Sequence, residues 1–296
     1  MPTRGKSINL FLMDGDPSGR IKCTLANWTG VAYQIPRTEL ERSKDRSDLS
    51  QSGVYFLFGN SDQTGDSVVY IGQAGLRKTG AGILNRLKEH RGDNDDYWHE
   101  AVVFTTSNNS FGPTEINYLE NRFTNLARDA SRYIVKNDIE PHIGNVTEEK
   151  QSELEEFVDY ARIVMGALGH KIFVPLSRPV QIPSSADADD TQTLRTFILP
   201  RNGLYAKGQI TSEGMVLLAG SPIRPEVLPA CRPHVKATRE KYKDYIDENW
   251  ILQKDILFDT PSGAAAFVIG GNASGNTEWK TADGRTLKEV EDTEAG

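Results

Sequence analysis

Two short, largely apolar runs, residues 53–58 and residues 67–72, are separated by a polar segment. In an extended chain, the two-residue period of the side chains sends Val54, Phe56 and Phe58 to one face, where they can enter a core. Both segments are rich in β-branched and aromatic residues, which favour strands. The segment between them consists mainly of turn-forming residues, so the pattern predicts an antiparallel hairpin.

The expected hairpin brings two tyrosines together. If the eight residues 59–66 join the strands symmetrically, Tyr55 lies directly opposite Tyr70, ~5 Å away and on the face opposite to the core residues. Such an aromatic pair can serve packing alone. Gly53 and Gly72, at the outer ends of the two strands, indicate instead that another backbone or a ligand approaches closely here.

The remainder of the first half contains further periodic segments. Strands are expected at residues 7–13, 20–25 and 100–107, and helices at residues 81–90, 112–134 and 148–169. Thr114 is the expected N-cap of the long helix, and Gly169 is expected to end the last one. This order predicts an α+β fold in which helices flank a small mixed or antiparallel sheet.

A change of composition divides the chain. Residues 178–193 contain prolines, paired serines and three aspartates, with almost nothing to bury. This composition favours a linker over a long surface loop within one domain. We therefore expect an N-terminal β extension at 1–50, a domain at 51–176 and a linker at 177–196, followed by a second domain at 197–296.

The second domain is expected to have an α+β fold of its own. Its pattern predicts strands at residues 195–200, 203–211 and 214–221 and a helix at residues 232–249. On that helix, basic residues recur at i+3 and i+4 spacing: Arg232, Lys236, Arg239 and Lys243. Such a stripe can neutralise nucleic-acid phosphates, and it is equally typical of a solvated face balanced by acidic neighbours.

Composition narrows the class of protein. The 296 residues carry 34 basic and 41 acidic side chains, a net charge of −7, so any nucleic-acid binding needs local basic patches. Two distant cysteines, Cys23 and Cys231, argue against a disulfide scaffold or a cysteine-rich zinc site. No apolar run is long enough to cross a membrane, and the beginning of the chain lacks the features of a secretory signal. These features favour a cytoplasmic protein.

Two helices carry candidate polar residues. Arg86 and His90 lie four positions apart, so they share one helix face, and a guanidinium suits a phosphate oxygen; a solvated surface would show the same spacing. On the long helix, Glu115 and Glu120 flank the apolar stripe on opposite edges, and periodicity does not choose between them. Glu120 is either a ligand of a hard divalent ion or a surface residue paired with a neighbouring arginine.

These residues, in this order, resemble the GIY-YIG nuclease module. Gly53-Val54-Tyr55 and Tyr70-Ile71-Gly72 match the two name motifs, with Val54 in place of isoleucine, and Arg86, His90 and Glu120 follow. The match covers about residues 53–137. The flanks resemble the leader and the uncharacterised C-terminal domain of a bacterial subgroup of this family.

The resemblance implies a fold and a chemistry. The fold is a three-stranded antiparallel sheet flanked by helices. Tyr55, Tyr70, Arg86, His90 and Glu120 are implied as catalytic, with a single Mg²⁺ or Mn²⁺ ion held by Glu120. An asparagine follows the glutamate helix in the family, and Asn137 is the candidate, with Asn125 as the alternative.

The function implied is metal-dependent hydrolysis of nucleic-acid phosphodiesters, with DNA as the expected substrate, in restriction, phage defence or repair. In the implied scheme Tyr55 orients or deprotonates water, its pKa lowered by nearby positive charge, and Arg86 binds the phosphate. Two alternatives stay open: a nuclease that cleaves RNA, and a non-catalytic nucleic-acid-binding or scaffold protein with a degenerate nuclease domain.

Overall fold

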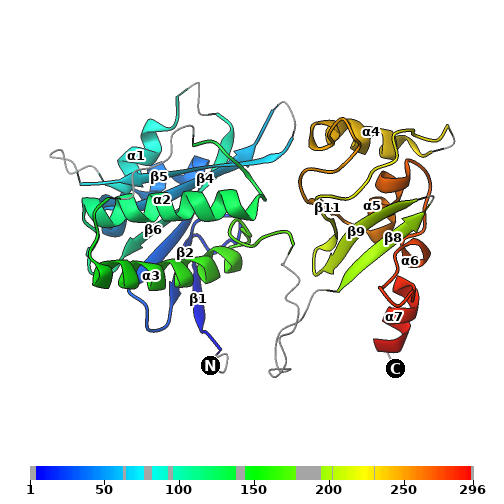
Figure 1. The fold of residues 1–296 in the computed structure, drawn as a ribbon. Helices are drawn as coiled ribbons and strands as arrows, with labels where there is room; N and C mark the ends of the chain where they lie inside the picture. Colours follow the sequence, from blue (N-terminus) through cyan, green and yellow to red (C-terminus); the bar gives the residue numbers. More distant parts are fainter. Residues whose placement is uncertain are drawn as a thin grey trace. The chain divides into compact units, whose positions relative to one another are not determined.

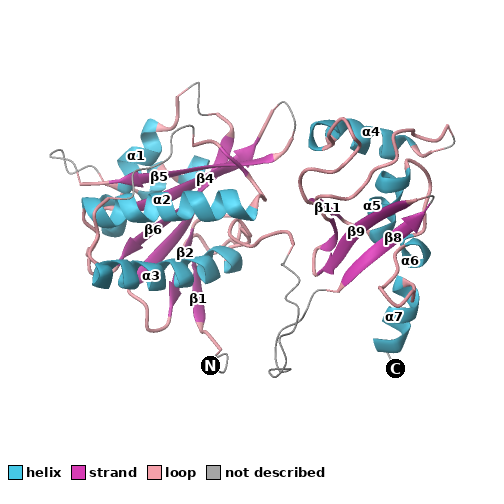
Figure 2. Cartoon of the chain, in the orientation of Figure 1, coloured by secondary structure: helices cyan, strands magenta, loops and turns pink. Residues whose placement is uncertain are grey.

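The chain forms two compact units, residues 1–175 and residues 176–296 (Figures 1 and 2). The structure, a computed structural model, describes residues 5–62, 65–76, 82–92, 96–137, 144–177, 195–201, 203–229 and 231–294. Most of the segment expected to be a linker lies outside the described residues. Its last residue, Thr196, already belongs to a strand of the second unit.

A mixed seven-stranded sheet is the centre of the first unit, with the strand order β1-β2-β3-β6-β4-β5-β7 among the described residues. The strands are β1 (Ile8–Leu12), β2 (Ile21–Leu25), β3 (Gly30–Pro36), β4 (Gly53–Asn60), β5 (Ser67–Ala74), β6 (Trp98–Thr106) and β7 (Ile134–Val135). All pairs are antiparallel except β5 with β7. The N-terminal β extension is therefore part of the same sheet, because β3 pairs with β6 along its length.

The β4–β5 hairpin is confirmed, but its register differs from the expected one by two residues. Tyr55 pairs with Gly72, and Tyr70 pairs with Leu57, because the strands continue to the pair Asn60–Ser67 and leave a shorter loop. A shift of two preserves the face of every side chain, since side chains alternate with period two. The two tyrosines are therefore diagonal neighbours on one face, with ring centroids 6.2 Å apart.

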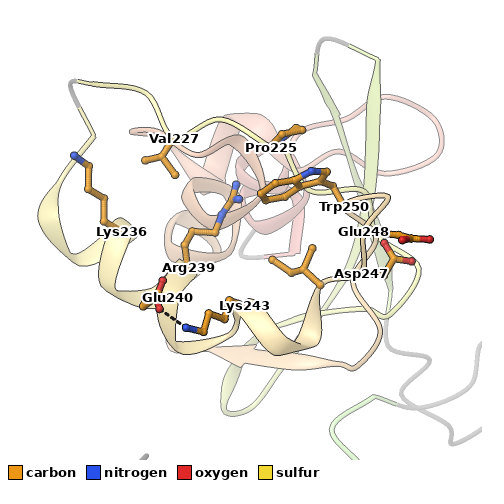
Figure 3. A pocket seen from close by; sticks show the side chains of 10 residues that line it. Pro225, Val227, Lys236, Arg239, Glu240, Lys243, Asp247, Glu248 and Trp250 are labelled. Carbon is orange, nitrogen blue, oxygen red and sulfur yellow. Dashed lines mark hydrogen bonds and ion pairs between the residues drawn. The ribbon is translucent and has the colours of Figure 1, made fainter.

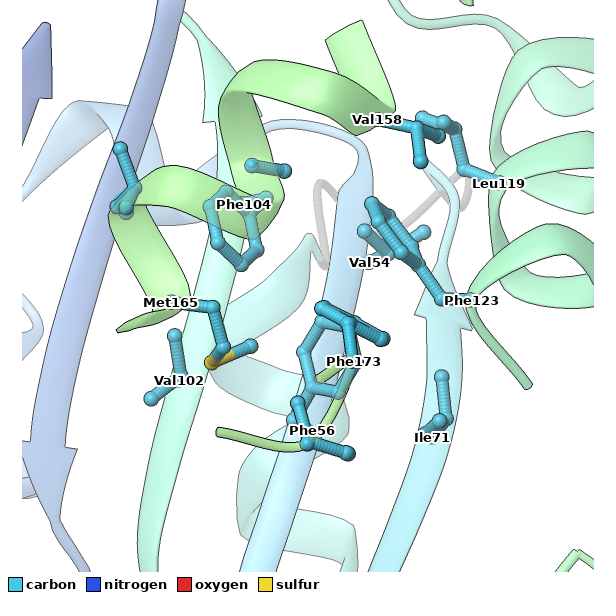
Figure 4. Packing of buried hydrophobic residues seen from close by; sticks show 14 of the residues in the cluster. Val54, Phe56, Ile71, Val102, Phe104, Leu119, Phe123, Val158, Met165 and Phe173 are labelled. Carbon is cyan, nitrogen blue, oxygen red and sulfur yellow. The ribbon is translucent and has the colours of Figure 1, made fainter. Parts of the chain in front are cut away.

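The two faces of this sheet are packed differently. On one face, α2 (Pro113–Ala130) and α3 (Glu148–Ala167) bury a large apolar cluster around Phe56, Phe104 and Phe123 (Figure 4). On the other face, the short helix α1 (Ile83–Glu89) packs on the cluster that contains Tyr55. Three 3₁₀ helices precede β4: η1 (Arg37–Glu39), η2 (Glu41–Ser43) and η3 (Ser47–Ser50).

The start of α2 corrects one expectation. Gly112, rather than Thr114, is the N-cap residue, and the Glu115 carboxylate accepts a hydrogen bond from the Gly112 amide at 3.0 Å. A carboxylate in the first turn also interacts favourably with the helix dipole. The Glu115 carboxylate is therefore engaged in capping the start of the helix. Strands β3 and β7 and the 3₁₀ helices were not expected from the sequence pattern.

The second unit has a four-stranded antiparallel sheet with its own apolar core, which includes Trp279 and Phe267. The strand order is β11-β10-β9-β8, and the strands are β8 (Thr196–Arg201), β9 (Leu204–Thr211), β10 (Gly214–Leu217) and β11 (Ile256–Phe258). The helices are α4 (Pro233–Lys241), η5 (Lys243–Tyr245), α5 (Pro261–Ile269), α6 (Gly275–Glu278) and α7 (Leu287–Glu294). The α+β class is confirmed in both units.

The helix expected at residues 232–249 ends at Lys241. Tyr242 and Tyr245 turn inward, and Tyr242 packs against Phe258 and Phe267 of the core. This packing favours a tighter 3₁₀ turn over continuation of the helix. None of the described helices is both long and apolar enough to cross a membrane.

Candidate active site

Tyr55 projects from β4 over a glycine on the neighbouring strand. Its side chain is fully buried, and Gly72 lies directly across in the register. A Cβ atom on Gly72 would stand 2.4 Å from the Tyr55 hydroxyl oxygen and 2.9 Å from the Tyr70 ring. The glycine in the second motif is therefore required by the close approach of two phenol rings, which agrees with the expectation of a close contact here.

Helix α1 brings an imidazole to the same phenol. The Tyr55 hydroxyl lies 2.8 Å from Nε2 of His90, and the rings of Tyr55 and Tyr70 have centroids 5.6 Å and 5.1 Å from that of His90. The indole of Trp98 fixes the end of the helix by donating to the His90 carbonyl at 2.7 Å. Residues from two strands and a helix thus converge on one hydroxyl group.

Arg86 completes this group from the preceding turn of α1. The positive charge of Arg86 acts to lower the pKa of the Tyr55 phenol, Arg86 forms an ion pair of 2.6 Å with Glu89, and its side chain is about one-third exposed. A guanidinium only donates, so a phenol oxygen beside it can serve as its acceptor. Which group donates in the contact between the Tyr55 hydroxyl and Nε2 of His90 depends on the tautomer of the imidazole.

Glu120 approaches from the opposite face of the sheet, at the edge of β5. Gln73 on that strand donates to the Glu120 carboxylate at 2.9 Å and also hydrogen-bonds Asn117. β5 pairs with β7 only at Val68 and Val69, so its last residues form the margin of the sheet, where the two faces meet. The structure thus separates the two glutamates that periodicity left equivalent.

The charges of Glu120 and of the tyrosine group influence one another. Burial raises the pKa of Glu120, while the hydrogen bond from Gln73 and the charge of Arg86 act in the opposite direction. The Glu120 carboxylate in turn contributes to raising the pKa of Tyr55. The neighbouring arginines are engaged elsewhere: Arg122 pairs with Glu155, and Arg128 donates to a backbone carbonyl.

The pKa of Tyr55 moves in the direction opposite to the expected one. Burial raises it strongly, and Tyr70 and Glu120 raise it further, while Arg86 offsets only part of this effect. A desolvated phenol favours its neutral form. Tyr55 is therefore a neutral hydrogen-bonding group in this structure. Arg86 lowers its pKa in the expected direction, but burial outweighs that effect.

The side chain of Asn137 forms hydrogen bonds with the backbone of β5. Its side-chain amide donates to the Ile71 carbonyl at 2.6 Å and accepts from the Ile71 amide at 3.1 Å, directly after β7. The side chain continues the strand pairing of β5 for one more residue, between Tyr70 and Gly72. Asn137 therefore positions the second motif, whereas Asn125, the alternative candidate, donates to Asn121 within α2.

The donor set fits a hard divalent ion. Among the described residues no group of three or more histidine, cysteine, aspartate or glutamate side chains converges. Mg²⁺ is commonly held by one or two carboxylates together with water and substrate phosphate. A single partly buried carboxylate at the edge of the sheet, under the influence of the Arg86 charge, meets that description, and it does not meet the demands of a structural zinc or calcium site.

The basic stripe expected on the helix at 232–249 does not form as a stripe. Arg232 precedes α4 as its N-cap, Lys243 follows it in η5, and only Lys236 and Arg239 lie on the helix itself. Arg239 is only 7% exposed, and its guanidinium donates to three backbone carbonyls, so it is not placed for a phosphate contact. Lys243 is exposed and pairs with Glu240.

Gln73 is a residue of the site that sequence reasoning missed. It holds the Glu120 carboxylate from the strand that carries the second motif. The sequence contained a signal for this residue. Gln73 directly follows Gly72 at the end of a buried strand, and a polar side chain that faces the core needs a hydrogen-bond partner.

Comparison with known proteins informs the second unit only. The family model of a domain of unknown function, DUF4357, matches residues 197–291. This is the segment that resembled an uncharacterised C-terminal domain. No GIY-YIG family model matches the chain. No curated protein matches it. The solved structures likewise contain no match.

Proposed function

We propose that the first unit is a metal-dependent nuclease of the GIY-YIG type that hydrolyses phosphodiester bonds of nucleic acid, with DNA as the substrate. The observation that carries the proposal is the contact of 2.8 Å between the Tyr55 hydroxyl and Nε2 of His90, with Tyr70 and Arg86 beside it. A buried phenol beside a partly buried imidazole and a partly exposed guanidinium is costly unless the polar groups have partners, and such groups cluster at functional sites.

The residues divide the chemistry among them. Arg86, permanently charged, binds a non-bridging phosphate oxygen and stabilises the charge that develops there. Tyr55 orients the attacking water and passes its own proton to His90 as it accepts one from the water. The neutral phenol supports this order, because its burial makes a standing phenolate unfavourable. Tyr70, half-buried, donates a hydrogen bond to the same phosphate.

Glu120 would hold a Mg²⁺ or Mn²⁺ ion, with Gln73 orienting its carboxylate. When bound, the ion supplies Lewis-acid stabilisation of the leaving oxygen. Glu120 must be ionised for this role. Its raised pKa therefore predicts that cleavage declines on acidification at a higher pH than an ordinary glutamate would cause.

The test is cleavage of plasmid, linear duplex and RNA by the full chain, with and without Mg²⁺. Glu120→Gln should lower the rate by at least about a hundredfold, since even indirect supports of metal ligands are worth ~10–100-fold. Glu115→Gln is the matched control: it makes the same change on the same helix, and glutamine can still accept from the Gly112 amide.

The outcomes are distinct. Loss of cleavage in the Glu120 variant alone supports the proposal. Equal activity of both variants, or no Mg²⁺-dependent cleavage of any substrate by the parent, contradicts it. Cleavage of RNA but not DNA would keep the chemistry and change the substrate.

A further inference from the structure

The second unit contains a pocket of about 600 Å³ that has no part in the proposed nuclease centre (Figure 3). Its walls combine apolar groups with charged ones: Pro225, Val227 and Trp250 on one side, and Lys236, Arg239 and Lys243 along α4 and η5. Pockets of this volume accommodate a ligand the size of a nucleotide. The lining itself indicates what class of ligand fits.

Trp250 is held in the pocket wall by an unusual backbone. Its φ is +60°, in the left-handed region where a bulky side chain is a steric outlier. The preceding turn enforces this geometry, because the Asp247 carboxylate accepts hydrogen bonds from the amides of Asn249 and Ile251. The Trp250 amide donates to the Asp247 carbonyl, and its own carbonyl accepts from Ile223.

The indole of Trp250 remains 39% exposed in this strained position, whereas Trp98 and Trp279 are buried. A glycine would occupy the same backbone position at no steric cost. A tryptophan at this position has a higher steric energy than a glycine would have. One face of its ring is directed at a pocket. The strain is accounted for if the ring serves as a binding surface.

Arg239 lies at the floor of the pocket. Its donors reach the carbonyls of Phe267 at 2.6 Å, Arg224 at 2.9 Å and Val268 at 3.2 Å, the first and last of these in the final turn of α5. Three of its five N–H donors are thereby used. Among the described residues no carboxylate forms an ion pair with it. Figure 3 shows the guanidinium between Val227 and Trp250.

An unneutralised cation beside an exposed aromatic ring selects an electron-rich planar ligand. Base stacking on indole and contact with arginine are the recurrent means by which proteins hold single-stranded nucleic acid. Two lysines at the rim, Lys236 and Lys243, lie where the phosphates on either side of a bound base would pass. Three acidic residues also line the pocket: the Asp247 carboxylate is bonded within its own turn, Glu240 pairs with Lys243, and Glu248 lies next to Asp247.

We propose that this pocket binds one unstacked base of a single-stranded nucleic-acid segment, with the base against Trp250 and its flanking phosphates at Lys236 and Lys243. The choice of nucleic acid rests on the proposed function of the first unit; the pocket itself does not depend on it. The pocket would give the domain of unknown function a role in holding substrate.

The test is binding of a fluorescein-labelled single-stranded oligothymidylate to the full chain in EDTA, so that no cleavage occurs. Trp250→Gly removes the ring and relieves the backbone, so the variant is expected to unfold at the same temperature as the parent or higher. Its affinity should fall by about fivefold to about 150-fold. Tyr205→Ala is the matched control, since Tyr205 is an exposed aromatic residue of the same unit outside the pocket.

Two charge variants sharpen the test. Lys236→Glu should weaken binding and reduce its salt dependence, while Lys288→Glu on α7 makes the same charge change away from the pocket and should have little effect. Glu240→Gln releases Lys243 from its ion pair and should tighten binding by up to about fivefold.

Unchanged affinity in Trp250→Gly, or an equal loss in Tyr205→Ala, overturns the proposal. Occupation of the pocket by a peptide in place of the oligonucleotide overturns it as well. Failure of the proposed function would appear separately, as absence of Mg²⁺-dependent cleavage in the parent.

Discussion

Arg86 and Arg239 have the same side chain on two short helices, and each was expected from the sequence to contact phosphate. In the first unit, Arg86 is about one-third exposed and pairs with Glu89, and its interactions with Glu89 and Tyr55 raise its pKa against the effect of burial. In the second unit, Arg239 is buried against three carbonyls, and burial lowers its pKa to about 10.

The difference lies in what surrounds each guanidinium. The Arg86 side chain is partly exposed, so a ligand can replace solvent at its guanidinium. Three of the five donors of Arg239 are used by backbone carbonyls, two of them in the C-terminal turn of α5, so its main contribution is to stability. Spacing along a helix therefore identifies which residues share a face, and burial decides what those residues do.

Truncating the two arginines should separate stability from activity. Arg239→Ala leaves three buried carbonyls without their donor and should destabilise the second unit by about 3 kcal/mol or more, at ~1 kcal/mol for each.

Arg86→Ala should lower the free energy of unfolding by about 1 kcal/mol or less, because its ion pair is solvent-exposed. It should nevertheless lower the rate of cleavage by about 10²–10³-fold. Calorimetry and cleavage rates check both. The comparison fails if Arg86→Ala unfolds the protein or Arg239→Ala leaves its stability unchanged.

Gly72→Ala tests whether the proposed nuclease centre depends on close packing. The added methyl group overlaps the Tyr55 hydroxyl at 2.4 Å, so we expect destabilisation of about 1–3 kcal/mol and displacement of the ring. Gly75→Ala is the control, because its Cβ would meet Ile116 at an ordinary 3.5 Å. Thermal unfolding of both variants measures the difference. Equal stability of the two would contradict the packing described for Tyr55.

Asn137→Ala tests a positioning role at the sheet margin. It removes both hydrogen bonds to the Ile71 backbone and should destabilise the first unit by about 1–3 kcal/mol, with a loss of cleavage. A purely catalytic asparagine would lower the rate without changing amide exchange in β5. Hydrogen exchange at Ile71 and Gly72 therefore distinguishes the two roles, and unchanged protection there would argue against positioning.

The smallest expected effect concerns pH. The pKa of Glu120 is raised in the folded state, mainly by burial, so the ionised carboxylate destabilises the fold once the pH exceeds the unfolded value of ~4.3. Glu120→Gln should therefore be slightly more stable than the parent at neutral pH in EDTA. The gain should vanish below about pH 4, where the carboxyl is protonated in both states. Melting temperatures at the two pH values check the sign; a less stable variant at neutral pH would refute it.

Several features of the site follow from local sequence rules. Alternation with period two placed Tyr55 and Tyr70 on the same face, and the two-residue change of register left that assignment intact. Helical spacing placed Arg86 and His90 together, and both reach the Tyr55 phenol. These relations depend on backbone geometry alone, so neighbouring residues suffice to predict them.

Other features were decided by contacts distant in sequence. Periodicity left Glu115 and Glu120 equivalent, and only the position of β5 separated a helix cap from a carboxylate at the sheet margin. Tyr242 packs against Phe258 and Phe267, and the helix ends there without a glycine or proline to mark its end.

The sequence by itself determined the strands of the hairpin, the faces of their side chains and the division into two α+β units, because these depend on residue type and spacing. The tertiary structure decided which charged groups are buried and what meets them. It assigned Arg239 to the end of α5 and Asn137 to the edge of β5, since desolvation and hydrogen-bond partners are set by chain segments far apart in sequence.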